Sequence, residues 1–275
     1  MAARPDPADA APVRGRPRAS LHDCRVVESR ALGAYRLLSF VSEPLARTAL
    51  AGQFLMIRRS GPSLDPLIPR PIGVSDVRDD LVDVLIEPRG KGTLTLAGAR
   101  VGDTLRALGP LGNGFDMEGK GGAVVVGGGI GVAPLKFLAR SLRERGREPL
   151  CVLGFRERSQ AAAAELFSGF EVDLLTEDGS AGRQGLVSDP LPGCLTAASG
   201  EPGPPEVFAC GPKPMLIAVE KVCRECGSAL QVSVDSHMAC GVGACQGCVV
   251  EAAGGYAKVC SDGPVFRSGE LAWTR

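Results

Sequence analysis

The sequence of 275 residues is poor in aromatic residues and in histidine. It contains 1 Trp, 2 Tyr and 9 Phe, and its 2 histidines are His22 and His237. No apolar stretch is long enough to cross a bilayer, and the N-terminal residues contain no hydrophobic segment of the signal-peptide type. The 31 basic and 31 acidic side chains leave a formal net charge of +0. We therefore expect neither a membrane span nor a nucleic-acid partner, and nothing resembles a substrate-cleaving site.

The composition otherwise predicts a globular protein with two domains and a small appendage. Hydrophobic residues make up 44% of the chain, charged residues 23%, and 37 residues are glycine. Residues 1–20 are rich in Ala, Pro and Arg and are predicted to be a disordered lead; Asp6 and Asp9 argue against an organelle transit peptide. Ten cysteines without a signal peptide indicate a reducing compartment, so the predicted location is cytoplasmic.

Four cysteines near the C-terminus form the most specific motif. Their spacing is C-x4-C-x2-C-x11-C, and the first three match the ligands of plant-type [2Fe–2S] clusters. Intervening glycines allow tight turns and a close approach of the backbone to an inorganic core. A structural zinc site would favour two separated ligand pairs, but it remains an alternative. The predicted metal ligands are Cys240, Cys245, Cys248 and Cys260, within a cluster domain at residues 228–275.

The N-terminal third predicts an antiparallel β-barrel. Short apolar runs alternate with Gly, Pro and Asp, as in small barrels built from regularly spaced strands. The expected strands cover residues 24–29, 35–41, 53–58 and 81–87, with a later strand in 102–112, and we place the barrel at residues 21–117.

Two short motifs in this barrel suggest a phosphate-bearing ligand. In Arg-Pro-Ile-Gly-Val-Ser at residues 70–75, Pro71 pushes Arg70 into an extended conformation from which its guanidinium can reach a phosphate. In Gly-Lys-Gly-Thr at residues 90–93, Gly92 and Thr93 offer N–H groups and a hydroxyl at a helix start. A turn arginine and a capping threonine are the simpler alternatives.

The middle third predicts a nucleotide-binding α/β domain at residues 118–227. A buried strand at 122–126 enters a glycine-rich turn, and a helix follows from Leu135. This order suits a dinucleotide pyrophosphate, because glycines admit the ligand and the helix N-terminus favours its charge. Pro134 fits the first helical turn. The candidate contacts are Gly127, Gly128, Gly129, Gly131, Ala133 and Pro134.

Further strands and helices alternate after this turn. Strands are expected at 149–155, 172–176 and 206–210, and helices at 160–167 and 215–226. In such a parallel sheet the ligand lies at the carboxyl ends of the strands. Cys210, Gly211 and Pro212 would therefore lie at the ligand edge, together with the glycine-rich turn.

Taken in order, these motifs resemble the ferredoxin–NADP reductase superfamily. The cysteine loop, followed by Lys-Val-Cys-Ser-Asp-Gly-Pro-Val-Phe, is most similar to that of the electron-transfer subunits of class 1B dihydroorotate dehydrogenase. The resemblance covers roughly residues 22–267. It implies FAD in the barrel, NAD on the α/β domain and a [2Fe–2S] cluster in the C-terminal domain.

The resemblance also implies a partner and a direction of electron flow. The partner is an FMN-containing dihydroorotate dehydrogenase catalytic subunit, in a heterotetramer with two of each chain. Electrons pass from FMN through the cluster and FAD to NAD⁺, in pyrimidine biosynthesis. Cys210 is expected beside the nicotinamide and flavin rings, as the catalytic residue. The implied flavin contacts are Arg70, Pro71, Ile72, Gly73, Leu85, Ile86, Glu87, Gly92 and Thr93.

The chain departs from the family at Gly73, where a serine is usual, so Ser75 is the candidate to supply a hydroxyl to the flavin. Two alternatives remain for the function as a whole. The same cofactors could serve another partner, such as a transhydrogenase, sulfide dehydrogenase or hydrogenase. The chain could instead be a zinc-stapled, nucleotide-sensing module. The pair Cys223 and Cys226 has redox-motif spacing but falls in an expected helix, so we interpret both as helix residues.

Overall fold

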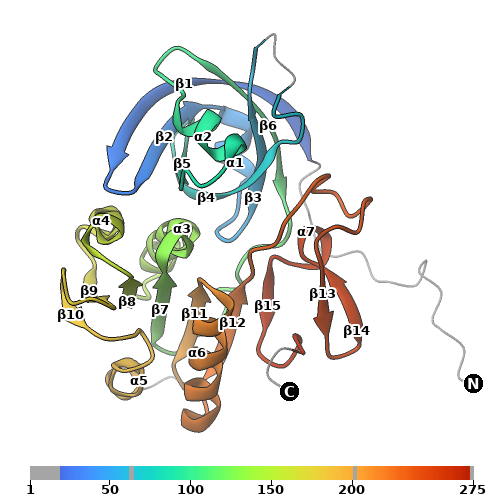
Figure 1. The fold of residues 1–275 in the computed structure, drawn as a ribbon. Coiled ribbons are helices and arrows are strands. Elements are labelled where there is room, and N and C mark those ends of the chain that lie inside the picture. The colour runs from blue at the N-terminus through green and yellow to red at the C-terminus, as the bar shows by residue number, and fades with distance from the viewer. Residues whose placement is uncertain (1–18, 62–64, 201–202, 273–275) are drawn as a thin grey trace, which may run out of the picture.

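The computed structural model describes residues 19–61, 65–200 and 203–272. It contains a closed antiparallel barrel, a mainly parallel sheet flanked by helices, and a small lobe beside the sheet (Figure 1). The predicted fold class is thereby confirmed. The predicted disordered lead at residues 1–20 lies outside the described residues, apart from Ala19 and from Ser20, which begins the first strand.

The barrel closes in the order β1-β2-β5-β4-β3-β6. Each strand that the sequence predicted in this region is present, but β4 and α1 were not predicted. Pro71 supplies no backbone N–H and lies near the start of β4, where a ladder tolerates the loss. The elements are β1 (Ser20–Leu32), β2 (Tyr35–Val41), α1 (Glu43–Thr48), β3 (Phe54–Arg59), β4 (Arg70–Arg78), β5 (Leu81–Ile86), α2 (Lys91–Ala97) and β6 (Thr104–Leu111).

The second sheet has the order β10-β9-β8-β7-β11-β12-β15. Its strands are parallel except for β15, which runs antiparallel to β12. They are β7 (Ala123–Gly128), β8 (Pro149–Phe155), β9 (Glu171–Thr176), β10 (Arg183–Gln184), β11 (Glu206–Cys210), β12 (Ala229–Ser233) and β15 (Val265–Arg267). The flanking helices are η2 (Gly129–Gly131), α3 (Val132–Glu144), α4 (Arg158–Ala161), η3 (Ala162–Phe167), α5 (Leu191–Ala198) and α6 (Lys213–Cys226).

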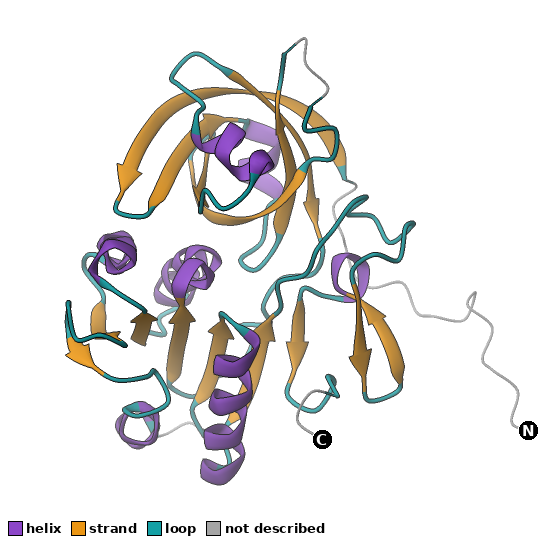
Figure 2. Cartoon of the chain, viewed as in Figure 1, coloured by secondary structure: helices purple, strands orange, loops and turns teal. Residues whose placement is uncertain are grey.

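The side chains of β7 alternate between the two faces of this sheet, and their packing shows which helix covers each face. Val125 packs in one apolar cluster with Leu135 of α3, whereas Val124 and Val126 pack in another with Leu216 of α6. Successive strand residues point to opposite faces, so α3 covers the face toward the barrel and α6 covers the other (Figure 2). None of the helices in the described ranges combines the length and the apolar character that a bilayer crossing requires.

The chain differs from the sequence predictions at several places in this domain, and one of them is the short strand β10. The helix expected at 160–167 is a short α4 that continues as the 3-10 helix η3. Helix α5 was not predicted. The sheet also continues past residue 228, where we expected the cluster domain to begin, because β12 and β15 pair with each other at its edge.

The small lobe lies between β12 and β15 in the chain. It contains the cysteine loop, followed by β13 (Val249–Ala252), β14 (Gly255–Lys258) and α7 (Val259–Asp262). Asn113, just after β6, ties β15 to the barrel, because its side chain both donates to the carbonyl of Val265 and accepts from its N–H, each at 2.9 Å.

A buried ion cluster joins the barrel to the sheet domain. Asp76 of β4 accepts from Arg140 of α3 at 2.7 Å and from Lys136 of the same helix at 3.2 Å. Arg140 also donates to the carbonyl of Val77 at 2.8 Å. The Asp76 side chain is only 8% exposed, so this contact fixes the barrel against α3 at a desolvated interface.

Candidate functional site

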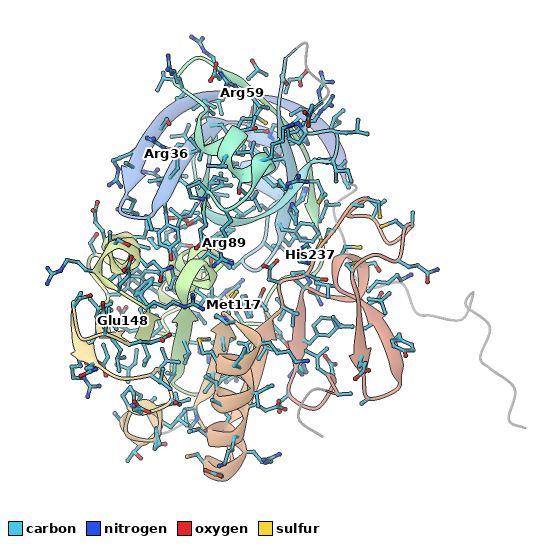
Figure 3. The ribbon with its side chains drawn as sticks, viewed as in Figure 1. Arg36, Arg59, Arg89, Met117, Glu148 and His237 are labelled. Carbon is cyan, nitrogen blue, oxygen red and sulfur yellow. The ribbon has the colours of Figure 1, made fainter. Side chains whose placement is uncertain are left out.

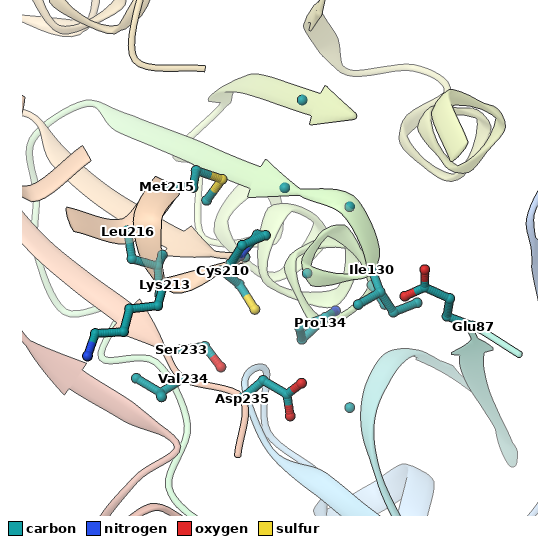
Figure 4. A pocket seen from close by; sticks show the side chains of 18 of the residues that line it. Glu87, Ile130, Pro134, Cys210, Lys213, Met215, Leu216, Ser233, Val234 and Asp235 are labelled. Carbon is teal, nitrogen blue, oxygen red and sulfur yellow. The ribbon is translucent and has the colours of Figure 1, made fainter. Parts of the chain in front are cut away.

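A cavity of about 770 Å³ opens between the barrel and the carboxyl edge of the sheet (Figure 4). Residues from the ends of β4 and β5 form one wall, and the ends of β7, β8, β9, β11 and β12 form the other. The structure therefore brings the barrel motifs and the glycine-rich turn together. The predicted residues that line this cavity are Pro71, Ile72, Gly73, Leu85, Glu87, Thr93, Gly128, Gly129, Gly131, Ala133, Pro134, Cys210, Gly211 and Pro212.

Five predicted contacts lie elsewhere. Arg70 and Gly92 line a second cavity of about 310 Å³, where a Cβ on Gly92 would come within 2.1 Å of the Arg70 Nε. Ser75 is 1% exposed inside the barrel wall and does not line either of these two cavities. Ile86 and Gly127 are buried behind the lining residues.

The Thr93 hydroxyl is engaged at the start of α2. Its oxygen accepts from the backbone N–H of Arg89 at 3.0 Å and of Gly90 at 3.1 Å. These contacts satisfy donors that a helix start leaves unpaired, so the hydroxyl serves as the capping group that the sequence offered as the simpler alternative.

The glycine-rich turn brings the backbone of α3 against β11. A Cβ on Gly131 would lie 2.4 Å from the carbonyl oxygen of Cys210, so any side chain there would separate the two elements. The N-terminus of the 13-residue α3 faces the cavity, with Pro134 in its first turn. Free N–H groups and the helix dipole make this end suitable for a phosphate group.

Cys210 is the thiol at this edge. It lies at the end of β11 beside Ser233 of β12. Burial raises the pKa of Cys210 to about 12, against a smaller lowering by a hydrogen bond with Ser233. The side chain therefore lines the cavity as an uncharged thiol, which suits contact with planar rings and not service as a nucleophile.

The cysteine loop surrounds its own sulfur atoms with backbone donors. The Cys240 Sγ accepts from the N–H of Cys245 at 3.4 Å and of Val242 at 3.5 Å, and the Cys260 Sγ accepts from Gly243 at 3.1 Å. Burial opposes ionisation of Cys240, but hydrogen bonds from the N–H groups of Cys245, Val242 and Ala244 and from the Cys245 thiol lower the pKa of Cys240 to about 6. The backbone donors thus favour a thiolate at Cys240, whereas burial raises the pKa of Cys260 to about 12.

The four thiols are arranged as two pairs. The sulfurs of Cys248 and Cys260 are 3.2 Å apart, and the Cys245 thiol is hydrogen-bonded with Cys240. In the described part of the chain, no three His, Cys, Asp or Glu side chains converge as the ligands of one metal ion would. Two thiolates at each of two irons is the ligand arrangement of a [2Fe–2S] cluster, so the residues fit that group.

The cysteine loop packs directly on the barrel. Gly241 has φ +71, and a Cβ there would lie 2.5 Å from Cγ of Met56 in β3. Upstream, Asp235 and Met238 line the large cavity. The polypeptide therefore leads from the cavity to the first cysteine within five residues.

The sequence did not predict several charged residues of the cavity. Arg89, Arg156, Glu177 and Asp235 all line it, and Arg89 lies under the barrel, facing the sheet domain (Figure 3). Arg156, Glu177 and Asp235 follow strands of the parallel sheet, whose carboxyl edge is the general place for a ligand, and Arg89 follows β5 of the barrel. No local motif distinguishes them from ordinary loop residues.

The remaining cysteines and histidines lie outside the cavity. Cys223 and Cys226 belong to α6, as predicted. Cys151 is 1% exposed in the core. His22 is half-buried in β1, and its Nε2 lies 2.7 Å from the Ser20 hydroxyl. His237 is exposed.

Solved structures share this architecture. The NADH-dependent reduced ferredoxin–NADP oxidoreductase is 29% identical, with a TM-score of 0.79 over 91% of this chain and 90% of that one. The Amycolatopsis cytochrome P450 reductase GcoB is 27% identical, with a TM-score of 0.59 over 77% of this chain and 68% of that one. The barrel, the nucleotide-type sheet and the paired thiols define a reductase of the ferredoxin–NADP type that carries an iron–sulfur domain.

Sequence relatives narrow this class. Residues 235–272 match the iron–sulfur cluster binding domain of dihydroorotate dehydrogenase B. The electron transfer subunit of dihydroorotate dehydrogenase B (NAD(+)) from Bacillus caldolyticus is 42% identical over 229 residues, or 80% of this chain and 86% of that protein. The subunit from Geobacillus thermodenitrificans is 36% identical over 266 residues, which are 94% of this chain and 98% of that protein. The chain belongs to this family of electron transfer subunits, and the predicted FAD, [2Fe–2S] cluster and NAD agree with that membership.

Proposed function

We propose that this chain passes electrons from an FMN-bearing dihydroorotate dehydrogenase catalytic subunit, through a [2Fe–2S] cluster and FAD, to NAD⁺ in pyrimidine biosynthesis. The contact of Gly241 with the barrel residue Met56 carries the proposal. It places the cysteine loop against the domain that would hold the flavin. This chain would not itself oxidise dihydroorotate.

The barrel side of the large cavity is proposed to hold FAD. Pro71, Ile72, Gly73, Leu85, Glu87 and Thr93 line it, and the second cavity adds Arg70 and Gly92. The Arg70 guanidinium supplies positive charge for a phosphate. FAD, when bound, exchanges a hydride with nicotinamide and single electrons with an iron–sulfur cluster.

The sheet side of the cavity is proposed to hold NAD. The N-terminus of α3 would receive the pyrophosphate, since Gly131 allows the backbone to approach closely. Cys210 would contact the rings. Its buried, protonated thiol adds no charge beside them and excludes water. The remaining proposed contacts are Gly128, Gly129, Ala133, Pro134, Gly211 and Pro212.

The proposed cluster ligands are Cys240 with Cys245 at one iron and Cys248 with Cys260 at the other. Backbone N–H groups around these sulfurs would stabilise their negative charge. The paired arrangement supports a two-iron cluster over the single zinc ion of the alternative module, which requires four ligands around one point.

The domain division that we propose follows the pairing of strands. The barrel spans residues 21–117, and the NAD domain spans 118–227 together with β12 and β15. The cluster lobe then comprises the residues between these two strands. All ten cysteines are free, which supports a reducing, cytoplasmic location. The assembly would contain two copies of this chain and two catalytic subunits.

Reconstitution with the catalytic subunit tests this function. The co-purified complex should contain FAD, iron and acid-labile sulfide, and dihydroorotate should reduce NAD⁺ only when both chains are present. Cys248→Ser should lose iron and this activity. Cys226→Ser, on the exposed end of α6, should retain both. Iron-free wild-type chain with full activity would contradict the proposal.

A second candidate is a chain with the same cofactors and another redox partner. The NADH-dependent reduced ferredoxin–NADP oxidoreductase, similar over nine-tenths of both chains, favours it. Under this candidate the complex binds every cofactor, yet dihydroorotate does not reduce NAD⁺. Reduced ferredoxin would then serve as the electron donor.

A further inference from the structure

The proposed function requires a proton at the flavin. Reduction of one NAD⁺ to NADH takes two electrons and one proton, transferred together as a hydride. An iron–sulfur cluster supplies electrons singly and without protons. Each turnover therefore needs one proton delivered to the flavin from a group of the protein or from water.

Three described residues that line the cavity carry a carboxylate: Glu87, Glu177 and Asp235. Glu87 is ion-paired with Arg89 at 2.9 Å. Glu177 follows β9, and the strands β8, β7 and β11 separate β9 from β12. Asp235 follows β12 and is the acid on the side of the cysteine loop, from which electrons arrive.

The surroundings of Asp235 suit a proton carrier. Figure 4 shows its side chain in the same cavity as Cys210 and Pro134, and it remains exposed to solvent there. Surrounding protein atoms raise the pKa of Asp235 by desolvation. The N–H of Ser236 and the charges of His237 and Arg89 oppose this rise only in part. Cys210 also faces Asp235 and is uncharged.

We propose that Asp235 delivers the proton that the bound flavin takes up when electrons arrive from the cluster. The O–H bond of the carboxylic acid breaks, and an N–H bond forms on the flavin ring. Two electrons from the cluster balance this addition. The carboxylate then regains a proton from water in the cavity, and the added hydrogen leaves within the hydride that NAD⁺ accepts.

The reverse reaction separates this role from a structural one. A hydride from NADH brings its own hydrogen to the flavin, so that step needs no acid. Asp235→Asn should therefore leave flavin reduction by NADH within about twofold of wild type. Flavin reduction from the cluster side should slow roughly 100-fold, the usual range for loss of a general acid. Single-turnover absorbance changes measure both steps.

Two variants and one spectroscopic measurement complete the test. Asp235→Glu should recover most of the cluster-side rate, and Glu251→Gln, on the exposed strand β13, should match wild type. Infrared titration of the chain without flavin should show the C=O band of a protonated carboxyl group. This band should titrate with a pKa above the usual range for Asp, and Asp235→Asn should remove it. The proposal would be overturned if Asp235→Asn slowed flavin reduction by NADH and flavin reduction from the cluster side equally, or if it slowed neither. Absence of the infrared band would also overturn it. Because cofactor content and dihydroorotate dependence are measured separately, failure here is distinguishable from failure of the proposed function.

Discussion

Single glycines decide how closely the cysteine loop approaches the barrel. At Gly241 the backbone has φ +71, in the left-handed region, and its open side faces Met56 and Leu111. A side chain would meet both a conformational penalty and a steric one. Gly254 in the same lobe has no neighbour within 4 Å of an added Cβ, so the chain contains its own comparison.

Gly241→Ala should reduce cluster content and stability, while Gly254→Ala should not. The left-handed conformation alone costs a non-glycine residue about 1 kcal/mol, and the clash with Met56 adds to this. Iron content per chain and the thermal midpoint measure the effect. A Gly241→Ala protein with wild-type iron content and midpoint would show that the loop has room to move.

At this scale the sequence predicted the residues whose chemistry depends on local spacing. Cys240, Cys245 and Cys248 fall within nine residues, so their convergence follows from one loop. Asp235 and Arg89 are separated by more than a hundred residues and meet only after the sheet edge faces the barrel. No local pattern contains that information.

Among the elements, α3 and β4 form the principal joint between barrel and sheet. Asp76 pairs with both Lys136 and Arg140 at this joint, and Arg140 also pairs with Glu144 of its own helix. Removing its charge would take away the carboxylate that these two partly buried cations share.

Asp76→Asn should lower the free energy of unfolding by about 3 kcal/mol, since breaking one side of a buried ion pair strands the other. Asp79→Asn, in the exposed turn three residues later, is the matched control, because Asn also tolerates its φ of +51. Urea unfolding followed by fluorescence measures both variants. Equal midpoints for the two would contradict a stabilising role for the ion cluster.

Strands with clear apolar runs were predictable, and those with mixed sequences were not. The run at 149–155 matches β8 residue for residue. β4 contains Pro71 and Gly73 and lacks the usual strand composition, so tertiary closure of the barrel determines it. β15 has three residues and exists because β12 offers it a partner.

Across the whole molecule, burial keeps several thiols protonated. Burial raises the pKa of Cys24 to about 11 and those of Cys151 and Cys223 to about 12, from an ordinary value of 9.0. The unfolded chain would release these protons near pH 9, whereas the folded chain retains them. Their contribution to stability is therefore complete below about pH 9 and is lost as pH rises from there toward 12.

The urea concentration at which half of the chain is unfolded should accordingly decrease when the pH is raised from 8 to 10. At pH 8 a maleimide should label exposed Cys226 in the native chain and reach Cys24, Cys151 and Cys223 only after unfolding. Mass spectrometry identifies the labelled peptides. Native labelling of the three buried thiols, or a midpoint that rises with pH, would contradict this prediction.

The pairing of β12 with β15 makes the cluster lobe an oversized hairpin turn. Residues 234–264 occupy the place where two residues would suffice to connect the two strands. During synthesis the outer edge of β12 remains unpaired until the lobe and β15 have been made, because β15 follows the lobe in the chain. Replacing the lobe by a two-residue turn would keep the pairing of β12 with β15 and would remove all four proposed cluster ligands. The proposed cluster ligands thus enter the chain as one insertion between two paired strands, and the inserted lobe is held by further contacts with the barrel and with the segment after β15.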